Sequence, residues 1–76
     1  MKDLILYIAQ NLVDDPGSVS VTEVEGEDGP VFELRVAPGD MGKVIGRQGR
    51  IAREIRTVVK SVAQRTGVKA SVEIVE

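Results

Sequence analysis

The chain has 76 residues, contains neither cysteine nor histidine, and carries a net charge of −2. A chain of this length is expected to fold as one domain, residues 1–76, and to bury only about 60% of its unfolded surface. The missing cysteines and histidines exclude disulfides and the commonest metal ligands, so we expect no metal and no cofactor. The sequence lacks an apolar run of membrane-spanning length and a signal-peptide pattern, which favours a cytoplasmic protein without membrane contact.

Charge is divided unevenly along the chain. Residues 42–66 carry seven basic side chains against one acidic, a net charge of +6, whereas the other residues carry three basic against eleven acidic, a net charge of −8. A basic run is often only a solvated helix face. The sharp division nevertheless indicates one surface that attracts anions and another that repels them.

The N-terminal segment has the apolar spacing of an amphipathic helix. Apolar residues recur at helical intervals from Leu4 to Leu12, and Asp3 is expected to be the N-cap. The turn at residues 14–17 contains a proline and a glycine, so we expect the helix to end near Val13.

Two strands are predicted to follow as an antiparallel hairpin. Alternation of apolar and polar residues predicts strands over 18–25 and 31–36, and the acidic, glycine-rich stretch 25–30 predicts the turn between them. Val24 breaks the alternation of the first strand, which predicts a bulge or a fraying end there.

Two helices separated by a glycine loop come next. Asp40 is expected to cap a short helix over residues 41–45, the stretch 46–49 interrupts it, and a longer helix runs from about residue 50 to 65. Gly67 is expected to end the longer helix as a left-handed residue. The buried face of the longer helix is predicted from apolar residues at helical spacing: Ile51, Ile55, Val58, Val59 and Val62.

A final strand over residues 68–74 completes the order α-β-β-α-α-β. Each strand has one apolar face, so the prediction is an α+β fold with three helices on one face of a three-stranded mixed sheet. A right-handed crossover places the strand of Phe32 in the centre, antiparallel to the first strand and parallel to the last.

The glycine loop has the composition of an anion-binding site. Its glycines leave the backbone bare, and the helix that follows presents free N–H groups and the positive end of its dipole. The candidate residues are the loop and its two flanking cations: Gly46, Arg47, Gln48, Gly49, Lys43 and Arg50.

Two other glycine-rich phosphate motifs do not fit this loop. A P-loop requires glycine where Ala37 stands and serine or threonine where Val44 stands. A dinucleotide fingerprint also requires glycine at Val44, and a strand rather than a short helix before the loop.

Apolar residues beside the loop point to single-stranded nucleic acid. Most of them belong to the core, and one or two are expected to face a groove that takes unstacked bases. The candidates for this groove are Gly42, Val44, Ile45 and Ile51. Tyr7 and Phe32, the only aromatic residues, are expected in the core or at its edge rather than as base-stacking platforms.

The stretch VIGRQGRIAREIR, within this element order, resembles the I-G-x-x-G core of KH domains of the type II, prokaryotic arrangement. The whole chain is most similar to the KhpA family of small bacterial proteins with a single KH domain. The resemblance implies that residues 46–49 clamp about four nucleotides of single-stranded RNA. It also implies a partner protein, either a second copy of the chain or a larger KH-domain protein.

Two classes of function therefore stay open. The first is a non-catalytic single-stranded RNA-binding protein, acting as a dimer in post-transcriptional regulation. The alternative is a KH-fold dimerisation or adaptor module with little RNA binding of its own. An enzyme has little support, because the residues near the loop offer only Asp40, Lys43 and Glu54 for chemistry. Arg53, Arg56 and Lys60 are expected opposite the buried helix face, where they would meet solvent, a partner or RNA.

Overall fold

The computed structural model describes residues 1–75 and confirms the predicted order of helices and strands. The helices and strands are α1 (Lys2–Gln10), β1 (Ser20–Glu25), β2 (Pro30–Arg35), α2 (Met41–Ile45), α3 (Arg50–Thr66) and β3 (Ser71–Ile74). Three short 3-10 turns lie between them: η1 (Pro16–Ser18), η2 (Pro38–Asp40) and η3 (Arg47–Gly49). The turn η1 takes the place of the predicted start of the first strand, so β1 begins two residues later than expected.

The three strands form the predicted mixed sheet, with β2 in the centre. β1 pairs with β2 antiparallel, and β2 pairs with β3 parallel. The predicted bulge or fraying end at Val24 is wrong, because the pairing of β1 with β2 runs without interruption to Glu25 and sets Val24 opposite Val31. Val24 instead lies on the face opposite to that of buried Val21, which explains the break in the alternation.

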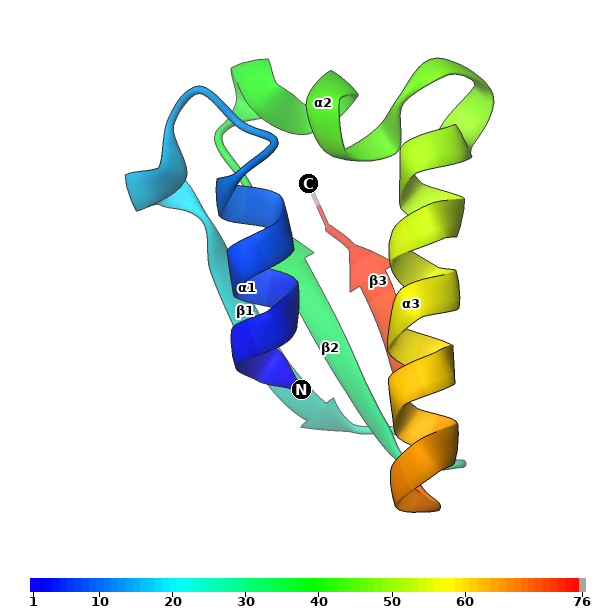
Figure 1. Cartoon of the computed structure of the whole chain (residues 1–76). Helices are drawn as coiled ribbons and strands as arrows, with labels where there is room; N and C mark the ends of the chain where they lie inside the picture. Colours follow the sequence, from blue (N-terminus) through cyan, green and yellow to red (C-terminus); the bar gives the residue numbers. More distant parts are fainter. Residues whose placement is uncertain (76) are drawn as a thin grey trace.

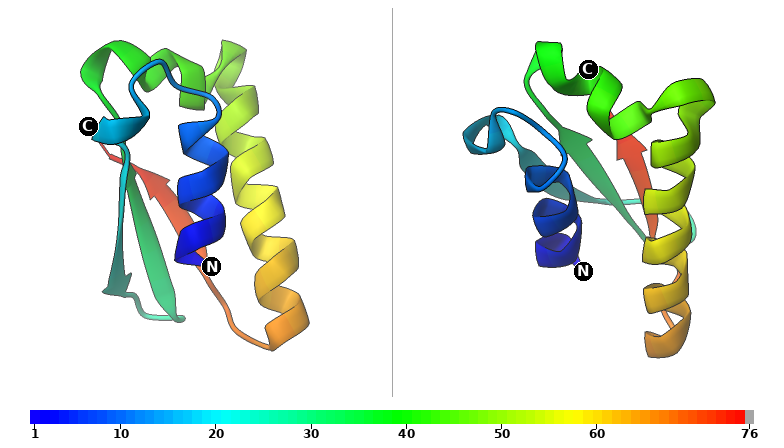
Figure 2. Two further views of the ribbon diagram at one scale, coloured as in Figure 1. Left: turned by 60° about the vertical axis from the view of Figure 1, so that its left-hand side comes forward. Right: turned by 45° about the horizontal axis from the view of Figure 1, so that its top comes forward.

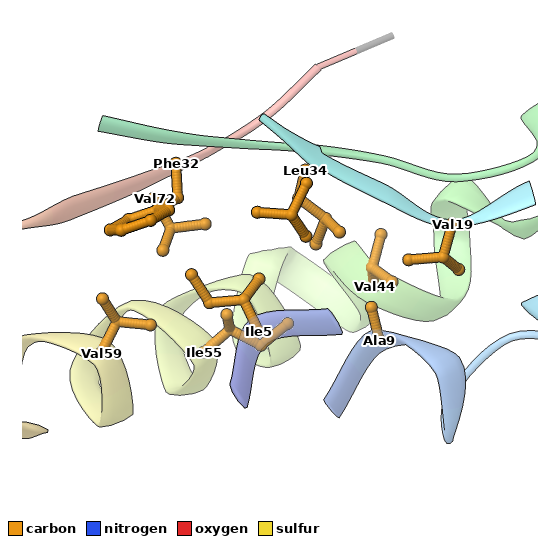
Figure 3. Packing of buried hydrophobic residues seen from close by; sticks show 10 residues of the cluster. Ile5, Ala9, Val19, Phe32, Leu34, Val44, Ile55, Val59 and Val72 are labelled. Atoms are coloured by element: carbon orange, nitrogen blue, oxygen red, sulfur yellow. The ribbon is translucent and has the colours of Figure 1, made fainter. Parts of the chain in front are cut away.

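The helices lie on one side of the sheet, as predicted (Figures 1 and 2). The core lies between the two layers, where side chains from both meet (Figure 3). The buried cluster consists of Ile5, Ala9, Val19, Val21, Phe32, Leu34, Val44, Ile55, Val59 and Val72. Val44 joins this cluster, so the short helix α2 is anchored in the core although it has only five residues.

α1 is shorter than predicted and its exposed side differs from expectation. Met1 rather than Asp3 is the N-cap residue, and the helix ends at Gln10, three residues before Val13. The Asn11 side-chain amide donates a hydrogen bond of 2.8 Å to the carbonyl oxygen of Tyr7, which favours a turn at this point. Tyr7 is 67% exposed, so its predicted place in the core or at its edge is wrong, whereas Phe32 is buried as expected.

α3 has the predicted bounds to within one residue, but its buried face is rotated. The residues of α3 that are buried are Ala52, Ile55, Val59 and Ala63. Val58, which was predicted to be buried, is 42% exposed. The predicted C-terminal glycine is confirmed: Gly67 has φ 74°, its N–H donates to the carbonyl oxygen of Gln64, and that of Val68 donates to Ala63.

Candidate functional site

The predicted site is a four-residue connection between two helices. α2 ends at Ile45, α3 begins at Arg50, and the residues between them form a single tight turn. Figure 1 shows this connection at the upper end of α3. Because Val44 and Ile55 are both buried in the core, the helices hold the two ends of the connection in fixed positions.

The backbone of the connection adopts conformations that favour glycine. Gly46 has φ 75° and ψ 174°, a region essentially reserved for glycine, and Gly49 has φ 75°. Gln48 has φ 56° and is the only non-glycine residue with a positive φ within residues 1–75. Hydrogen bonds from the N–H of Gly46 to the carbonyl of Gly42 (2.9 Å) and from the N–H of Gly49 to the carbonyl of Gly46 (3.1 Å) hold this shape.

The three glycines of the site have different surroundings. A Cβ atom at Gly46 would lie 2.9 Å from the backbone nitrogen of Ile51, which is closer than such atoms approach in proteins. A Cβ atom at Gly42 or Gly49 would meet no neighbouring atom of residues 1–75 within 4 Å. Gly46 is therefore required for packing against α3, whereas Gly42 and Gly49 leave bare backbone facing open space.

The start of α3 adds an electrostatic component. Gly49 is the N-cap residue, and no side chain in the described part of the chain caps the helix there. The first N–H groups of a helix have no partner within the helix, and its dipole places partial positive charge at this end. The N–H of Arg50 already donates to the carbonyl oxygen of Arg47. An anion that reaches the connection therefore meets the positive end of the helix dipole as well as basic side chains.

The three candidate cations differ in how free they are. Arg47 is exposed and forms no ion pair with any residue in the range 1–75. Arg50 lies 3.8 Å from the exposed carboxylate of Glu54, a loose surface pair. Lys43 is engaged more closely, with its Nζ 3.0 Å from Asp14 and 3.7 Å from Asp40.

Asp40 is the N-cap residue of α2, as predicted, but its side chain makes no capping hydrogen bond to that helix. Asp40 is only 4% exposed, and its Oδ2 atom accepts a hydrogen bond of 3.0 Å from the backbone N–H of Asp15. The other oxygen of the carboxylate faces Lys43. Asp40 thus fastens the segment between α1 and β1 to the start of α2, and the two segments lie side by side in Figures 1 and 2.

The contact between Asp14 and Lys43 could not be predicted from the sequence. The hydrogen bond with Asp14 and the negative charge of that carboxylate raise the pKa of Lys43 above its ordinary value. The two residues are 29 positions apart and belong to segments that no sequence pattern pairs. Only the tertiary fold brings the acidic turn after α1 against the basic flank of the glycine connection.

Ile45, the last residue of α2, is an apolar residue beside the connection that faces solvent. It is 37% exposed, whereas Val44 is fully buried and Ile51 is half-buried against the core. Of the three apolar side chains named from the sequence, Ile45 is therefore the one that the structure leaves most available for contact with a ligand.

The basic residues further along α3 do not share one environment. Arg53 and Lys60 are exposed, but Arg56 leans toward the sheet, where its Nε donates to the carbonyl oxygen of Val72 at 3.4 Å. The prediction that Arg56 lies opposite the buried face is wrong, since the guanidinium extends across to the β3 strand.

Three structural features bear on whether other parts of the described chain hold a second binding site. An open hollow of about 630 Å³ lies between the β1–β2 turn and the end of α3, and none of the loop residues lines it. Within residues 1–75 no group of histidine, cysteine, aspartate or glutamate side chains is arranged to hold a metal ion. None of the helices in this range has the length and apolar character needed to cross a membrane.

Comparison with known proteins agrees with this architecture. The family model described as "KhpA/KhpB, KH domain" matches residues 2–74. The chain belongs to this family. The fold is accordingly that of a KH domain, and the resemblance to the KhpA family indicated by the glycine loop and the element order is confirmed.

Curated relatives resemble the chain over nearly its full length. A protein of Clostridium perfringens is 56% identical over 75 residues, which are 99% of this chain and 100% of the relative. Relatives in Chlamydia trachomatis and Aquifex aeolicus are 50% and 47% identical over 76 residues, covering all of this chain and 97% and 96% of their own length. All three are named RNA-binding protein KhpA.

A solved structure supports the fold alone. A crystal structure of an Aquifex aeolicus Era variant bound to GDP.AlF4- superposes on 96% of this chain with a TM-score of 0.62. The sequences are 18% identical, and the match covers 28% of the Era chain. It therefore shows that the same arrangement of helices and sheet occurs as part of a larger protein.

Proposed function

We propose that the chain binds single-stranded RNA through the connection between α2 and α3, with the glycine backbone against the phosphates. The relatives that share about half of its sequence over their full length are named RNA-binding proteins. In this proposal Gly46, Arg47, Gln48 and Gly49 form the clamp. Gly42 and Ile45 line its α2 side, and Lys43 and Arg50 flank it with positive charge.

The observation that carries the proposal is the combination of bare backbone and a free cation on a rigid connection. Gly49 faces open space in a conformation fixed by a hydrogen bond, and exposed Arg47 has no ion-pair partner within residues 1–75. A phosphate can approach such a backbone without meeting a Cβ atom, and the start of α3 favours its charge.

Single strands suit this site better than duplexes. Ile45 offers an exposed apolar side chain one residue before the glycines, where an unstacked base can make van der Waals contact. Phe32 is buried in the core, so the sheet offers no aromatic platform of the kind that stacks bases elsewhere. The grip therefore consists of backbone contacts and one apolar surface, which predicts weak binding by a single copy.

Reversing the charge of the clamp tests the proposal. The double variant Arg47→Asp with Gln48→Asp should keep the fold, because both side chains are exposed and aspartate tolerates the positive φ of residue 48. RNA affinity should fall by about ten-fold or more, equivalent to at least 1.4 kcal/mol. The measurement is a fluorescence-anisotropy titration with labelled short single-stranded RNA.

A matched control uses the same pair of residue types at the far end of α3. The double variant Gln64→Asp with Arg65→Asp makes the same charge change at two exposed positions, away from the connection. Its RNA affinity should change much less. Equal losses in the two variants would mean that general charge, rather than the clamp, determines binding, and no loss in either would reject the proposal.

The cellular role that fits this chemistry is non-catalytic. A backbone clamp holds RNA without positioning a nucleophile or a base, so we propose a part in post-transcriptional regulation in the cytoplasm. The family model covers both KhpA and KhpB, which fits pairing with a second copy or with a larger KH-domain protein.

A specific observation favours the adaptor alternative as a second candidate. Val58 on α3 is 42% exposed and Tyr7 on α1 is 67% exposed, so both helices present apolar groups to solvent. If the chain acts mainly as an adaptor, the titration above will show little RNA affinity in the unaltered protein. The same titration therefore decides between the two candidates.

A further inference from the structure

We propose that Asp14 lowers the affinity of the site for RNA by holding Lys43 in an ion pair that a phosphate must replace. This inference rests on the function proposed above and adds an affinity-determining residue to it. Asp14 lies outside the connection, in the segment between α1 and η1, and reaches Lys43 only through the fold.

The two carboxylates that face Lys43 have different roles. Asp40 is buried and fixed, because one of its oxygens accepts a hydrogen bond from the N–H of Asp15 while the other lies 3.7 Å from Lys43. The side chain of Asp14 is 81% exposed, yet it makes the shorter contact, 3.0 Å. Asp40 is therefore a structural anchor, and Asp14 is the partner that can be exchanged for another anion.

The balance of charge explains why Asp14 opposes RNA. Two carboxylates and one ammonium group give this corner of the site a net charge of −1. A phosphate that approaches Lys43 must displace the Asp14 carboxylate and remain near its negative charge. Without that carboxylate, Lys43 would face only Asp40, and the corner would be neutral.

Neighbouring Asp15 provides a control that the molecule itself supplies. Its side chain accepts a hydrogen bond of 2.7 Å from the hydroxyl of Ser18. Within residues 1–75, the carboxylates that form ion pairs with Lys43 are those of Asp14 and Asp40, not that of Asp15. Asp14→Asn and Asp15→Asn therefore remove the same charge from adjacent positions, but only the first releases Lys43.

The experiment compares RNA titrations of five proteins: the unaltered chain, Asp14→Asn, Asp15→Asn, Lys43→Gln, and Asp14→Asn combined with Lys43→Gln. Asp14→Asn should tighten binding about two- to five-fold, the factor that corresponds to releasing an exposed ion pair. Asp15→Asn should have a clearly smaller effect. Adding Asp14→Asn to Lys43→Gln should give no gain over Lys43→Gln alone, because the cause of the gain is Lys43.

Salt dependence gives a second readout that needs no change at Lys43. If Lys43 becomes free to neutralise one more phosphate, the slope of log affinity against log salt should steepen by about 0.7 in Asp14→Asn. An unchanged slope together with unchanged affinity would overturn the inference and would identify the Asp14–Lys43 pair as a contact that only docks the segment.

The two proposals fail in different ways. RNA binding that is lost in the Arg47 and Gln48 double variant but insensitive to Asp14→Asn rejects only the role of Asp14. An equal gain from Asp14→Asn and Asp15→Asn also rejects it, in favour of general charge. An unaltered chain that binds no RNA, and stays without binding after Asp14→Asn, rejects both.

Discussion

Gly46 and Gly49 share φ 75°, yet the structure requires them for different reasons. At Gly46 the neighbouring Ile51 fills the space that a side chain would need, so glycine is a condition of folding. At Gly49 the space is open, and only the backbone angle favours glycine. Gly46 is therefore required for packing, whereas Gly49 is favoured only by its backbone angle. The spacing G-x-x-G alone does not reveal this difference.

Gly42 gives the sharpest residue-scale prediction, because its glycine has no structural justification. It lies within α2 and has room for a methyl group, so Gly42→Ala should stabilise the helix by up to about 1 kcal/mol. If RNA approaches the bare backbone of α2, the same methyl group should weaken binding several-fold. Urea unfolding and RNA titration measure the two effects.

Gly39 is the matched control for this prediction. It also has open space around the position of a Cβ atom, but it belongs to the η2 turn before α2. Gly39→Ala should leave RNA affinity unchanged. A loss of affinity in both alanine variants, or in neither, would contradict a close approach of RNA at Gly42.

At the scale of the element, α3 shows how small residues set the face of a helix. Ala52 and Ala63, small residues near its two ends, are both buried. Larger Val58, which apolar spacing assigned to the core, is left 42% exposed. The spacing of large apolar residues therefore predicts the length of such a helix correctly, but it predicts a buried face that is rotated from the observed one.

Adjacent valines test this orientation of α3. Val59 is fully buried, so Val59→Ala should lower the free energy of unfolding by about 1–3 kcal/mol through lost burial and a cavity. Val58→Ala should change it by less than about 0.5 kcal/mol. Both substitutions change helix propensity equally, so their difference in urea unfolding reports burial. Similar losses for both would contradict the observed orientation.

Local patterns predicted the elements of this chain well and their long-range contacts poorly. Alternation and helical spacing gave the strands and the central place of β2, because each element buries one apolar face. The Asp14–Lys43 pair, the bond from Asp15 to Asp40 and the reach of Arg56 to Val72 depend on which loops meet in space. Such contacts leave no periodic signal in the sequence.

At the scale of the whole molecule, the fold separates the two charge regions that the sequence shows. The basic stretch occupies α2, the connection and α3, whereas most acidic residues lie in the remaining segments. Asp14 and Asp40 are exceptions, since both approach the basic region at Lys43, and Glu54 lies within the basic region itself. The basic region therefore extends along α2 and α3, and the two carboxylates at Lys43 place an acidic corner beside the connection.

The salt dependence of RNA binding measures how much of the basic region is used. Each phosphate neutralised on a single strand contributes a slope of about −0.7 in a plot of log affinity against log salt. A clamp that uses Arg47, Arg50 and part of Lys43 predicts a slope of about −2.

A strand that instead followed the whole of α3 would meet all seven basic residues of the stretch 42–66 and give a slope near about −5. Titrations of labelled single-stranded RNA over a range of potassium chloride concentrations distinguish these paths. Arg53→Gln with Lys60→Gln should leave the slope near −2, since both cations are exposed beyond the first turn of α3. A slope that becomes shallower by about 1.4, the value for two lost phosphate contacts, would place the RNA along the helix instead of at the connection.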